Sequence, residues 1–582
     1  MNLLSHPQLQ EVVLNNLAVP NVLGLRSANS ATNAVVLQFA QGKLADATRD
    51  VPNDAMEARR RIRSIPRPSC PFSFVRLLQR TLSEDQWSDF VSEVQVIDTR
   101  LFSKMEGKER ELIKALIANP IHLQFLSTKL NRIGQLGPLI AQCREMRFLA
   151  TPEMFFNSFS EDARALEPYW KDRPELKENV LPPPPPPSGF ATAASVLSKL
   201  PNIELFHCET RGCSFSEVMT TAAEYWPNLT ALRVNFLEKT DDMSIISDVL
   251  RRLEILEVET FSRLPIGQIL LNCDRFQVLH LGLCEPRGLS DAELREILAA
   301  NEHLEELGVV WKEKVSDSFL LPMSRLRRLR SVKIALSPQW DISTWQAALS
   351  ALAPQLVELR IGDSDYRGCT LTYDFLAPLA TSNRTLPLEV LEIHWSSCNG
   401  GVTGQTVAAI LAKCPRLRAL HIPNTTSGRL PGTQCAIAAA THCRELQAWD
   451  CVSLVLTDAD VAFIAKHCVQ LELLHTKTAI SDATLVALLK NARNMRSLHA
   501  KGSQLTVDGI KALGLLGSRK IKYCNLVAVR GDKEEVPTGD VSTPSMNDIG
   551  SDSTPGDVLQ FLRRTQPQMG ITPPSAGWLV SS

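Results

Sequence analysis

The most regular feature of the chain is an apolar spacing that recurs from residue 94 to residue 526, with an apolar residue followed by others three and five positions later. PRLRALHI, with Leu417, Leu420 and Ile422, is a clear copy. The first apolar residue of each copy, here called the marker, falls at 94, 123, 146, 203, 229, 253, 276, 304, 329, 356, 388, 417, 446, 471, 495 and 521. The steps between markers are 23 to 32 residues long, apart from one of 57. A period of this size predicts a solenoid of stacked repeats.

Each repeat predicts a short strand, a loop and a helix that returns to the next strand. Thr457 is placed to cap one such helix, and Leu471 and Leu474 belong to the strand that follows it. Ser290 and Glu293 have the spacing of a capping box at the start of another helix. Because one unit cannot bury its apolar face alone, we expect stacked neighbours to share a continuous core. The prediction is an α/β, right-handed solenoid with a parallel sheet on its concave face and helices on its convex face.

Composition narrows the class of protein. A chain of 582 residues exceeds one ordinary domain core, and its formal net charge of −1 offers no electrostatic attraction to nucleic acid or to an anionic membrane. No stretch approaches the roughly 20 apolar residues that span a bilayer, and the first residues lack the layout of a secretory signal. The fourteen cysteines contain no CxxC pair, which is typical of reduced thiols in the cytoplasm or nucleus.

Five of these cysteines keep one phase with the repeat, each three residues before a marker: Cys143, Cys273, Cys414, Cys443 and Cys468. A buried cysteine acts as a small apolar side chain, which suits the corner between a helix and a strand. This pattern resembles the cysteine-containing class of leucine-rich repeats, and the resemblance covers about three quarters of the chain. It implies a leucine-rich-repeat solenoid over residues 91–527, with about sixteen repeats.

Residues 1–45 predict a separate small all-α unit, in which Ser5 and Gln8 can open a helix. The segment HPQLQEVVLNNLAVPNVLGLRSANSATNAVV resembles the F-box, although His6, Asn21 and Thr32 replace the opening Leu, the acidic cap and the usual Trp of that motif. The resemblance implies docking on the adaptor of a cullin-based ubiquitin ligase. The matching positions are Pro7, Leu9, Val13, Leu17, Leu23, Leu25 and Arg26, and the first six are the implied adaptor-binding residues. The alternative is a generic helical cap for the first repeat.

Residues 46–90 predict a helical connector. Arg59, Arg60, Arg61 and Arg63 form a basic run, for which we expect a solvated helix face rather than a nuclear-import patch. Trp87 and Phe90 are expected to close the hydrophobic end of the first repeat.

Two further segments depart from the repeat. The long step between markers holds a Pro-rich insertion near 153–198, with an unbroken proline run at 182–187. Polyproline of this length predicts a stiff spacer, with an SH3-, WW- or profilin-type partner as the alternative. Residues 528–582 are polar and rich in Ser, Thr, Pro and Gly, which predicts a largely disordered tail. Apolar residues near its end leave open whether the tail folds back on the solenoid.

No nucleotide-binding loop, metalloprotease motif or nucleophile elbow is present, so we expect neither an enzyme nor a cofactor. The position four residues after each marker should face the concave side, because alternate strand residues point to opposite faces. That column runs through His207, Arg233, Glu257, His280, Gly308, Lys333, Arg360, Glu392, His421, Asp450, His475 and His499. The last four could hold zinc only if their side chains converged. A polar partner-binding face is the favoured interpretation.

These features together predict a substrate-recognition subunit of a cullin-based ubiquitin ligase that binds a protein substrate through its repeats. Trp449 is expected in the core, whereas Trp311 and Trp395 lie just beyond their strands. The predicted substrate-binding residues are Trp311, Arg360, Glu392, Trp395, His421, Asp450, His475 and His499. The alternatives are a repeat scaffold with no ubiquitin role and a leucine-rich GTPase-activating protein with a catalytic arginine.

Overall fold

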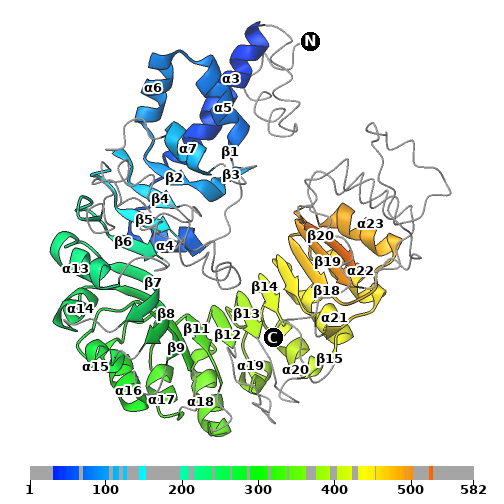
Figure 1. Ribbon diagram of the computed structural model, residues 1–582. Helices are drawn as coiled ribbons and strands as arrows, with labels where there is room; N and C mark the ends of the chain where they lie inside the picture. Colours follow the sequence, from blue (N-terminus) through cyan, green and yellow to red (C-terminus); the bar gives the residue numbers. More distant parts are fainter. Residues whose placement is uncertain are drawn as a thin grey trace, which may run out of the picture. The chain divides into compact units, whose positions relative to one another are not determined.

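The chain divides after Gly282 into two compact units, unit 1 and unit 2. The computed structural model (Figure 1) describes residues 30–63, 70–103, 109–116, 122–127, 143–151, 197–208, 215–238, 243–262, 265–284, 289–311, 316–336, 340–361, 375–393, 403–422, 430–452, 454–492, 494–501 and 523–527. The proline run, the tail and most of the F-box-like segment therefore lie outside the described residues. None of the helices within these ranges has the length and hydropathy needed to cross a bilayer.

Unit 1 begins with helices and continues as strand–helix repeats. Its helices are α3 (Ser30–Thr48), α4 (Ala55–Arg63), α5 (Phe72–Thr81), α6 (Glu84–Ser92), α7 (Glu109–Leu116), α13 (Phe215–Tyr225), α14 (Met243–Leu250) and α15 (Ile266–Leu270). Its strands are β1 (Cys70–Pro71), β2 (Val96–Asp98), β3 (Phe102–Ser103), β4 (Phe125–Ser127), β5 (Phe148–Thr151), β6 (Leu205–Cys208), β7 (Ala231–Glu238), β8 (Ile255–Ser262) and β9 (Val278–Cys284). A parallel sheet joins β2, β4, β5, β6, β7, β8 and β9 in that order, and β1 pairs with β3.

Unit 2 consists of repeats throughout its described part. Its helices are α16 (Asp291–Ala300), α17 (Leu320–Ser324), α18 (Ile342–Leu352), α19 (Ala377–Thr381), α20 (Gly404–Leu411), α21 (Thr433–His442), α22 (Asp458–His467) and α23 (Asp482–Asn491). Its main sheet is parallel and runs through β10 (Glu306–Trp311), β11 (Ser331–Ile334), β12 (Glu358–Ile361), β13 (Val390–Ile393), β14 (Ala419–His421), β16 (Ala448–Asp450), β18 (Leu473–Thr476), β19 (Ser497–Lys501) and β20 (Tyr523–Val527). A second short pair joins β15 (Leu430–Pro431) to β17 (Leu454–Val455).

The repeat phase predicted from the apolar spacing is confirmed. In each unit, every strand of the parallel sheet described above begins two residues after a marker, from Val96 in β2 to Tyr523 in β20. The markers from Val94 to Met495 are buried, and so are the residues three positions after them, which point toward the helices. Trp449 occupies such a position and is 0% exposed, as expected for a core residue. The fold is the predicted α/β leucine-rich-repeat solenoid.

The helix starts follow the predicted capping chemistry. Ser290 and Glu293 form a capping box at α16, and Thr457 forms one with Asp460 at α22. Successive helices of unit 2 pack side by side, α20 on α21, α21 on α22 and α22 on α23, on one face of the sheet. We call the opposite face, which carries the positions two and four residues after each marker, the inner face.

The five phased cysteines are buried and unpaired by disulfides, as the sequence predicts. Cys443 Sγ donates toward the carbonyl oxygens of Leu411 and Cys414, both at 3.4 Å, so the thiol contributes a weak hydrogen bond at the corner between repeats. Burial raises the pKa of Cys414 and of Cys468 to about 12. These thiols are therefore protonated at neutral pH and unreactive, which fits a packing role.

The connector differs from its prediction at the basic run. Within α4, Arg60 is exposed, but Arg59 is only 4% exposed and Arg61 is partly buried, so the expectation of a solvated helix face is wrong. The reason is that α4 lies against the inner face of unit 1 and contacts β5 and β6. Trp87 and Phe90 stack on one another with ring centroids 6.2 Å apart and remain partly exposed.

Candidate functional site

The inner-face column predicted from the sequence exists in both units. In unit 1 the register aligns His207 with Arg233, Arg233 with Glu257 and Glu257 with His280. In unit 2 it aligns Gly308, Lys333, Arg360, Glu392, His421, Asp450, His475 and His499 on successive strands. Since neighbouring parallel strands are about 4.8 Å apart, side chains on adjacent strands of the column can contact one another, apart from Gly308, which has none. Their role in binding stays a prediction.

Asp450 is the centre of the row in unit 2. His421 Nδ1 lies 2.7 Å from Asp450 Oδ2, and His475 Nδ1 lies 2.8 Å from Asp450 Oδ1. The imidazole of His475 then packs on that of His499, with ring centroids 5.1 Å apart. Four consecutive strands, β14, β16, β18 and β19, thus supply one connected polar row. The Asp450 side chain is 22% exposed, so the row is open to a partner.

The contacts set the protonation of this row. Burial by itself raises the pKa of Asp450, but the hydrogen bonds from His421 and His475 outweigh it and hold that pKa well below its usual range. The same hydrogen bond to Asp450 raises the pKa of His421. Burial and the neighbouring His475 lower the pKa of His499. Asp450 is therefore anionic at every physiological pH, and protonation of His421 beside it changes the local net charge.

The other end of the row is an ion-pair network. Arg360 pairs with Glu358 on its own strand, and its Nη1 lies 3.0 Å from Glu392 Oε2 on β13. These side chains are 36%, 21% and 19% exposed, so the pairs are screened by solvent and contribute little stability. They fix the orientation of Arg360 and Glu392 beside His421. The row from Glu358 to Asp450 contains three carboxylates and one guanidinium.

The geometry of this row directs both Nδ1 atoms at a carboxylate rather than at a common point. Within the described ranges, no three His, Cys, Asp or Glu side chains are arranged to hold a metal ion. The arrangement can instead accept and donate hydrogen bonds and pair with charges on a protein partner.

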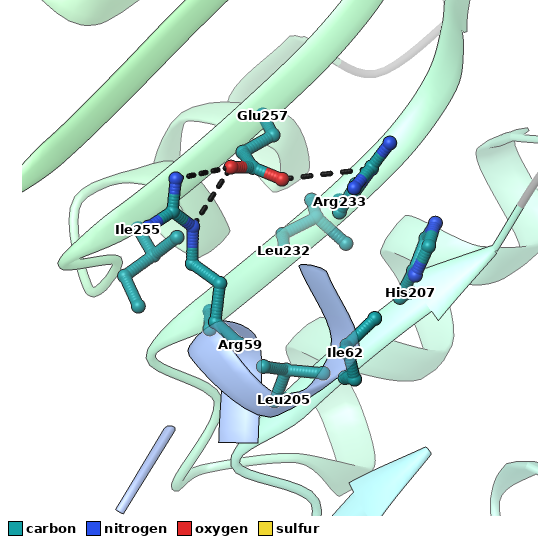
Figure 2. Close-up of a pocket in the computed structure, with 9 residues that line it drawn as sticks. Arg59, Ile62, Leu205, His207, Leu232, Arg233, Ile255 and Glu257 are labelled. Carbon is teal, nitrogen blue, oxygen red and sulfur yellow. Dashed lines mark hydrogen bonds and ion pairs between the residues drawn. The ribbon is translucent and has the colours of Figure 1, made fainter. Parts of the chain in front are cut away.

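The counterpart of this row in unit 1 is covered by α4. Arg59 donates from Nε (2.7 Å) and Nη2 (2.5 Å) to Oε1 of Glu257 on β8, and both side chains are less than 10% exposed (Figure 2). Arg233 Nε lies 3.5 Å from Glu257 Oε2, and His280 Nδ1 lies 3.6 Å from Oε1. Glu257 is thus surrounded by basic side chains from three elements, one of them the connector helix.

Below Arg59, α4 packs on apolar side chains of the inner face. Ala55 and Ala58 of the helix belong to one buried cluster with strand residues two positions after the markers. Those strand residues are Val96, Phe125, Phe148, Leu205, Ala231, Ile255 and Val278. A cavity of about 10 Å³, room for one water molecule, remains among Arg59, Ile62, Leu205 and Glu257 (Figure 2).

A second arginine of α4 reaches the same column. Arg61 Nε lies 3.8 Å from Asp98 Oδ2 on β2, and Asp98 is fully buried. Its guanidinium carbon also lies 5.1 Å from the ring centroid of Phe125, a cation–π distance. The helix therefore binds the column through two arginines and an apolar stripe.

Sequence reasoning missed this occupant, although a signal was present. The positions two residues after the markers are apolar in unit 1, as in Leu205 and Ile255, whereas Glu306 and Glu358 stand there in unit 2. Strands that are apolar on both faces are typically covered on both faces. The pattern therefore indicates an inner face that is covered along the whole of unit 1, whereas in unit 2 it recurs on consecutive strands only at Val390, Ala419, Ala448 and Leu473.

The remaining predicted site residues are less fully described. Trp311 ends β10, and only its backbone is described, while Trp395 lies outside the described residues. The predicted adaptor-binding residues, Pro7, Leu9, Val13, Leu17, Leu23 and Leu25, also lie outside them. Helix α3 crosses the expected boundary at residue 45 and packs on α5 and β2.

No family model matches the chain. Among solved structures, a leucine-rich-repeat protein of Leptospira interrogans is similar, with a TM-score of 0.31 and 11% identity over 74% of this chain and 93% of that one. The yeast Rad7–Elc1 complex contains a chain with a TM-score of 0.30 and 13% identity, covering 64% and 93%. The InlJ domain of Listeria monocytogenes has a TM-score of 0.29 and 16% identity, covering 58% and 65%. The fold assignment rests on the strand register described above.

Proposed function

We propose that this chain is the substrate-recognition subunit of a cullin-based ubiquitin ligase and that it binds a protein substrate on the inner face of unit 2. Substrate binding is proposed at this face because the polar row around Asp450 is partly exposed. The equivalent face in unit 1 is already covered by α4. The ubiquitin half is supported by the F-box resemblance of residues 1–45.

The mechanism is proximity. A solenoid that holds a substrate while its N-terminal segment binds the ligase adaptor raises the effective concentration of substrate lysines near the charged E2 enzyme. No residue of this chain performs chemistry in that scheme. A substrate interface of ordinary size buries about 800 Å² on each partner, which is a small part of a repeat array of this length.

The adaptor half is tested by purification of the tagged chain from cells. Adaptor and cullin should co-purify with the full chain and be lost when residues 1–29 are deleted. The deletion stops there because Val36, Ala40 and Leu44 of α3 are buried in unit 1. A chain with Leu9→Glu and Val13→Glu should behave like the deletion, whereas the matched Gln8→Glu and Gln10→Glu should keep both proteins. If the full chain never captures a cullin, the chain is a scaffold with no ubiquitin role.

The substrate half is tested on the same material. Asp450→Arg reverses the central charge of the row and should abolish capture of the substrate while adaptor and cullin stay bound. Glu445→Arg makes the same change at an exposed turn residue and should alter neither. Equal substrate capture by the two variants would place the substrate elsewhere on the chain.

A further inference from the structure

The inner faces of the two units share one pattern across four consecutive strands. In unit 1, the positions two residues after the markers bring Leu205, Ala231, Ile255 and Val278 into register. In unit 2, the same positions bring Val390, Ala419, Ala448 and Leu473 into register. We call the first set together with Glu257 the covered patch and the second set together with Asp450 the open patch. Each patch is an apolar strip four strands wide.

The carboxylates of the two patches, and the basic or titratable side chains beside them, also stand at corresponding positions. In both, the carboxylate stands on the third of the four strands, as Glu257 on β8 and as Asp450 on β16. In both, a histidine on the fourth strand directs Nδ1 at that carboxylate, His280 at 3.6 Å and His475 at 2.8 Å. The second strand supplies a basic or titratable neighbour, which is Arg233 in unit 1 and His421 in unit 2.

The patches differ in what covers them. The four apolar residues of the covered patch are at most 4% exposed because α4 lies on them, and Arg59 reaches Glu257 from that helix. The four apolar residues of the open patch are all partly exposed, and Asp450 retains 22% of its side-chain surface. The open patch therefore presents an apolar strip and a carboxylate like those that α4 covers and pairs with in unit 1.

We propose that the open patch binds a short amphipathic helix of a partner protein that presents an arginine to Asp450, as α4 presents Arg59 to Glu257. This names the class of ligand for the inner-face site and rests on the proposed function. Charge favours a basic ligand, because the row from Glu358 to Asp450 holds the carboxylates of Glu358, Glu392 and Asp450 and only one guanidinium, that of Arg360. An arginine fits better than a lysine, since its guanidinium donates two hydrogen bonds in one plane to a carboxylate.

The small size of the strand side chains fits a close helix. Ala419 and Ala448 occupy the centre of the open patch, and Ala231 occupies the centre of the covered patch, where it is 1% exposed. Small residues under a helix let its backbone approach the sheet. The helix itself need bring only short apolar residues, as α4 does with Ala55 and Ala58.

The test uses the chemistry of α4 as a probe. A labelled peptide with the sequence of residues 51–63 is titrated into the full chain, and binding is followed by fluorescence anisotropy. The Arg59→Glu peptide should bind at least about tenfold more weakly, because it loses a charge-assisted pair on a desolvated patch. The Arg60→Glu peptide has the same net charge, and its altered residue is exposed on α4, so its affinity should change little.

Variants of the full chain locate the site. Asp450→Asn should weaken binding of the unaltered peptide about tenfold, whereas Glu445→Gln and Glu257→Gln should not. Equal binding of the two glutamate peptides, loss of binding with Glu257→Gln alone, or no binding to the full chain would each overturn the proposal. Substrate capture that depends on Asp450 would survive any of these results, so the proposed function is judged separately.

The pH dependence separates a basic ligand from an acidic one. His421 faces Asp450, Glu392 and Arg360, and its protonation adds a positive charge beside Asp450. The peptide should therefore bind more weakly at pH 6 than at pH 8. Stronger binding at pH 6 would indicate that the patch accepts acidic ligands, which contradicts the proposal.

Discussion

The covered patch of unit 1 and the open patch of unit 2 are built from the same repeat positions, yet they meet different surroundings. Glu257 is 7% exposed and bound by an arginine 198 residues away in the sequence, whereas Asp450 is 22% exposed and bound by histidines of its own sheet. The difference shows that one strand column can be covered by a helix of the same chain in one part of a solenoid and stay partly exposed in another.

The largest effect is expected for the buried Arg59–Glu257 ion pair, which holds α4 on the sheet. Arg59→Ala leaves Glu257 as a buried charge without its main partner, so the free energy of unfolding of unit 1 should fall by about 3–5 kcal/mol. Denaturant unfolding, with proteolysis near residues 55–63 as a second probe, measures the loss. Arg60→Ala, on the exposed side of α4, should change stability by about 0.5 kcal/mol or less. Equal effects of the two changes would mean that the pair does not stabilise unit 1.

An intermediate effect is expected when an equivalent apolar side chain is truncated to alanine in each of the two patches. Ile255→Ala opens a cavity under α4, where Ile255 is 3% exposed, and should cost about 2–5 kcal/mol. Leu473→Ala, at the equivalent and partly exposed position, should cost only about 1 kcal/mol because solvent fills the space. Thermal or denaturant unfolding of the two variants provides the comparison. A larger loss for Leu473→Ala would show that the open patch is covered in the folded chain.

The smallest effect concerns protonation in the open patch. Titration of the imidazoles by NMR should place the pKa of His421 above 6.5, because of its hydrogen bond to Asp450, and that of His499 below 6.5, because of burial and the nearby His475. Asp450→Asn should lower the pKa of His421. An unchanged value would mean that the pair does not form in solution.

The same shifts predict a small pH dependence of stability. The raised pKa of His421 adds stability that is complete below 6.5 and is lost as the pH rises through its folded value. The lowered pKa of His499 acts in the opposite sense, because its contribution is lost as the pH falls below 6.5. The difference between the wild-type chain and Asp450→Asn, measured from pH 6 to pH 8, gives the part that depends on the Asp450 carboxylate. That difference should shrink as the pH rises.

Much of the fold was predictable because the repeat is a local pattern. A marker such as Leu417, the apolar residue three positions later and a cap such as Thr457 all act within one repeat, so their spacing determines the strand, the helix and the phase between them. The column from Arg360 to His499 followed from the same phase, since alternate strand residues face opposite sides.

The site was harder to predict because its character depends on contacts across repeats. The sequence placed His421, Asp450 and His475 on neighbouring strands, but it did not show that both imidazoles would direct Nδ1 at one carboxylate. It also indicated a solvated face for the arginines of α4, because a short basic helix has no local feature that marks a buried arginine.

The amino-acid sequence by itself thus determined the repeat, its register and the residues that line the inner face, because these depend on spacings of a few residues. Only the tertiary structure decided that α4 covers the face in unit 1 and that the face around Asp450 is partly exposed. The physical reason is that burying the charge of Arg59 or of Glu257 alone costs free energy, and that the ion pair between them offsets this cost. That compensation joins residues 198 positions apart and cannot be read from either segment separately.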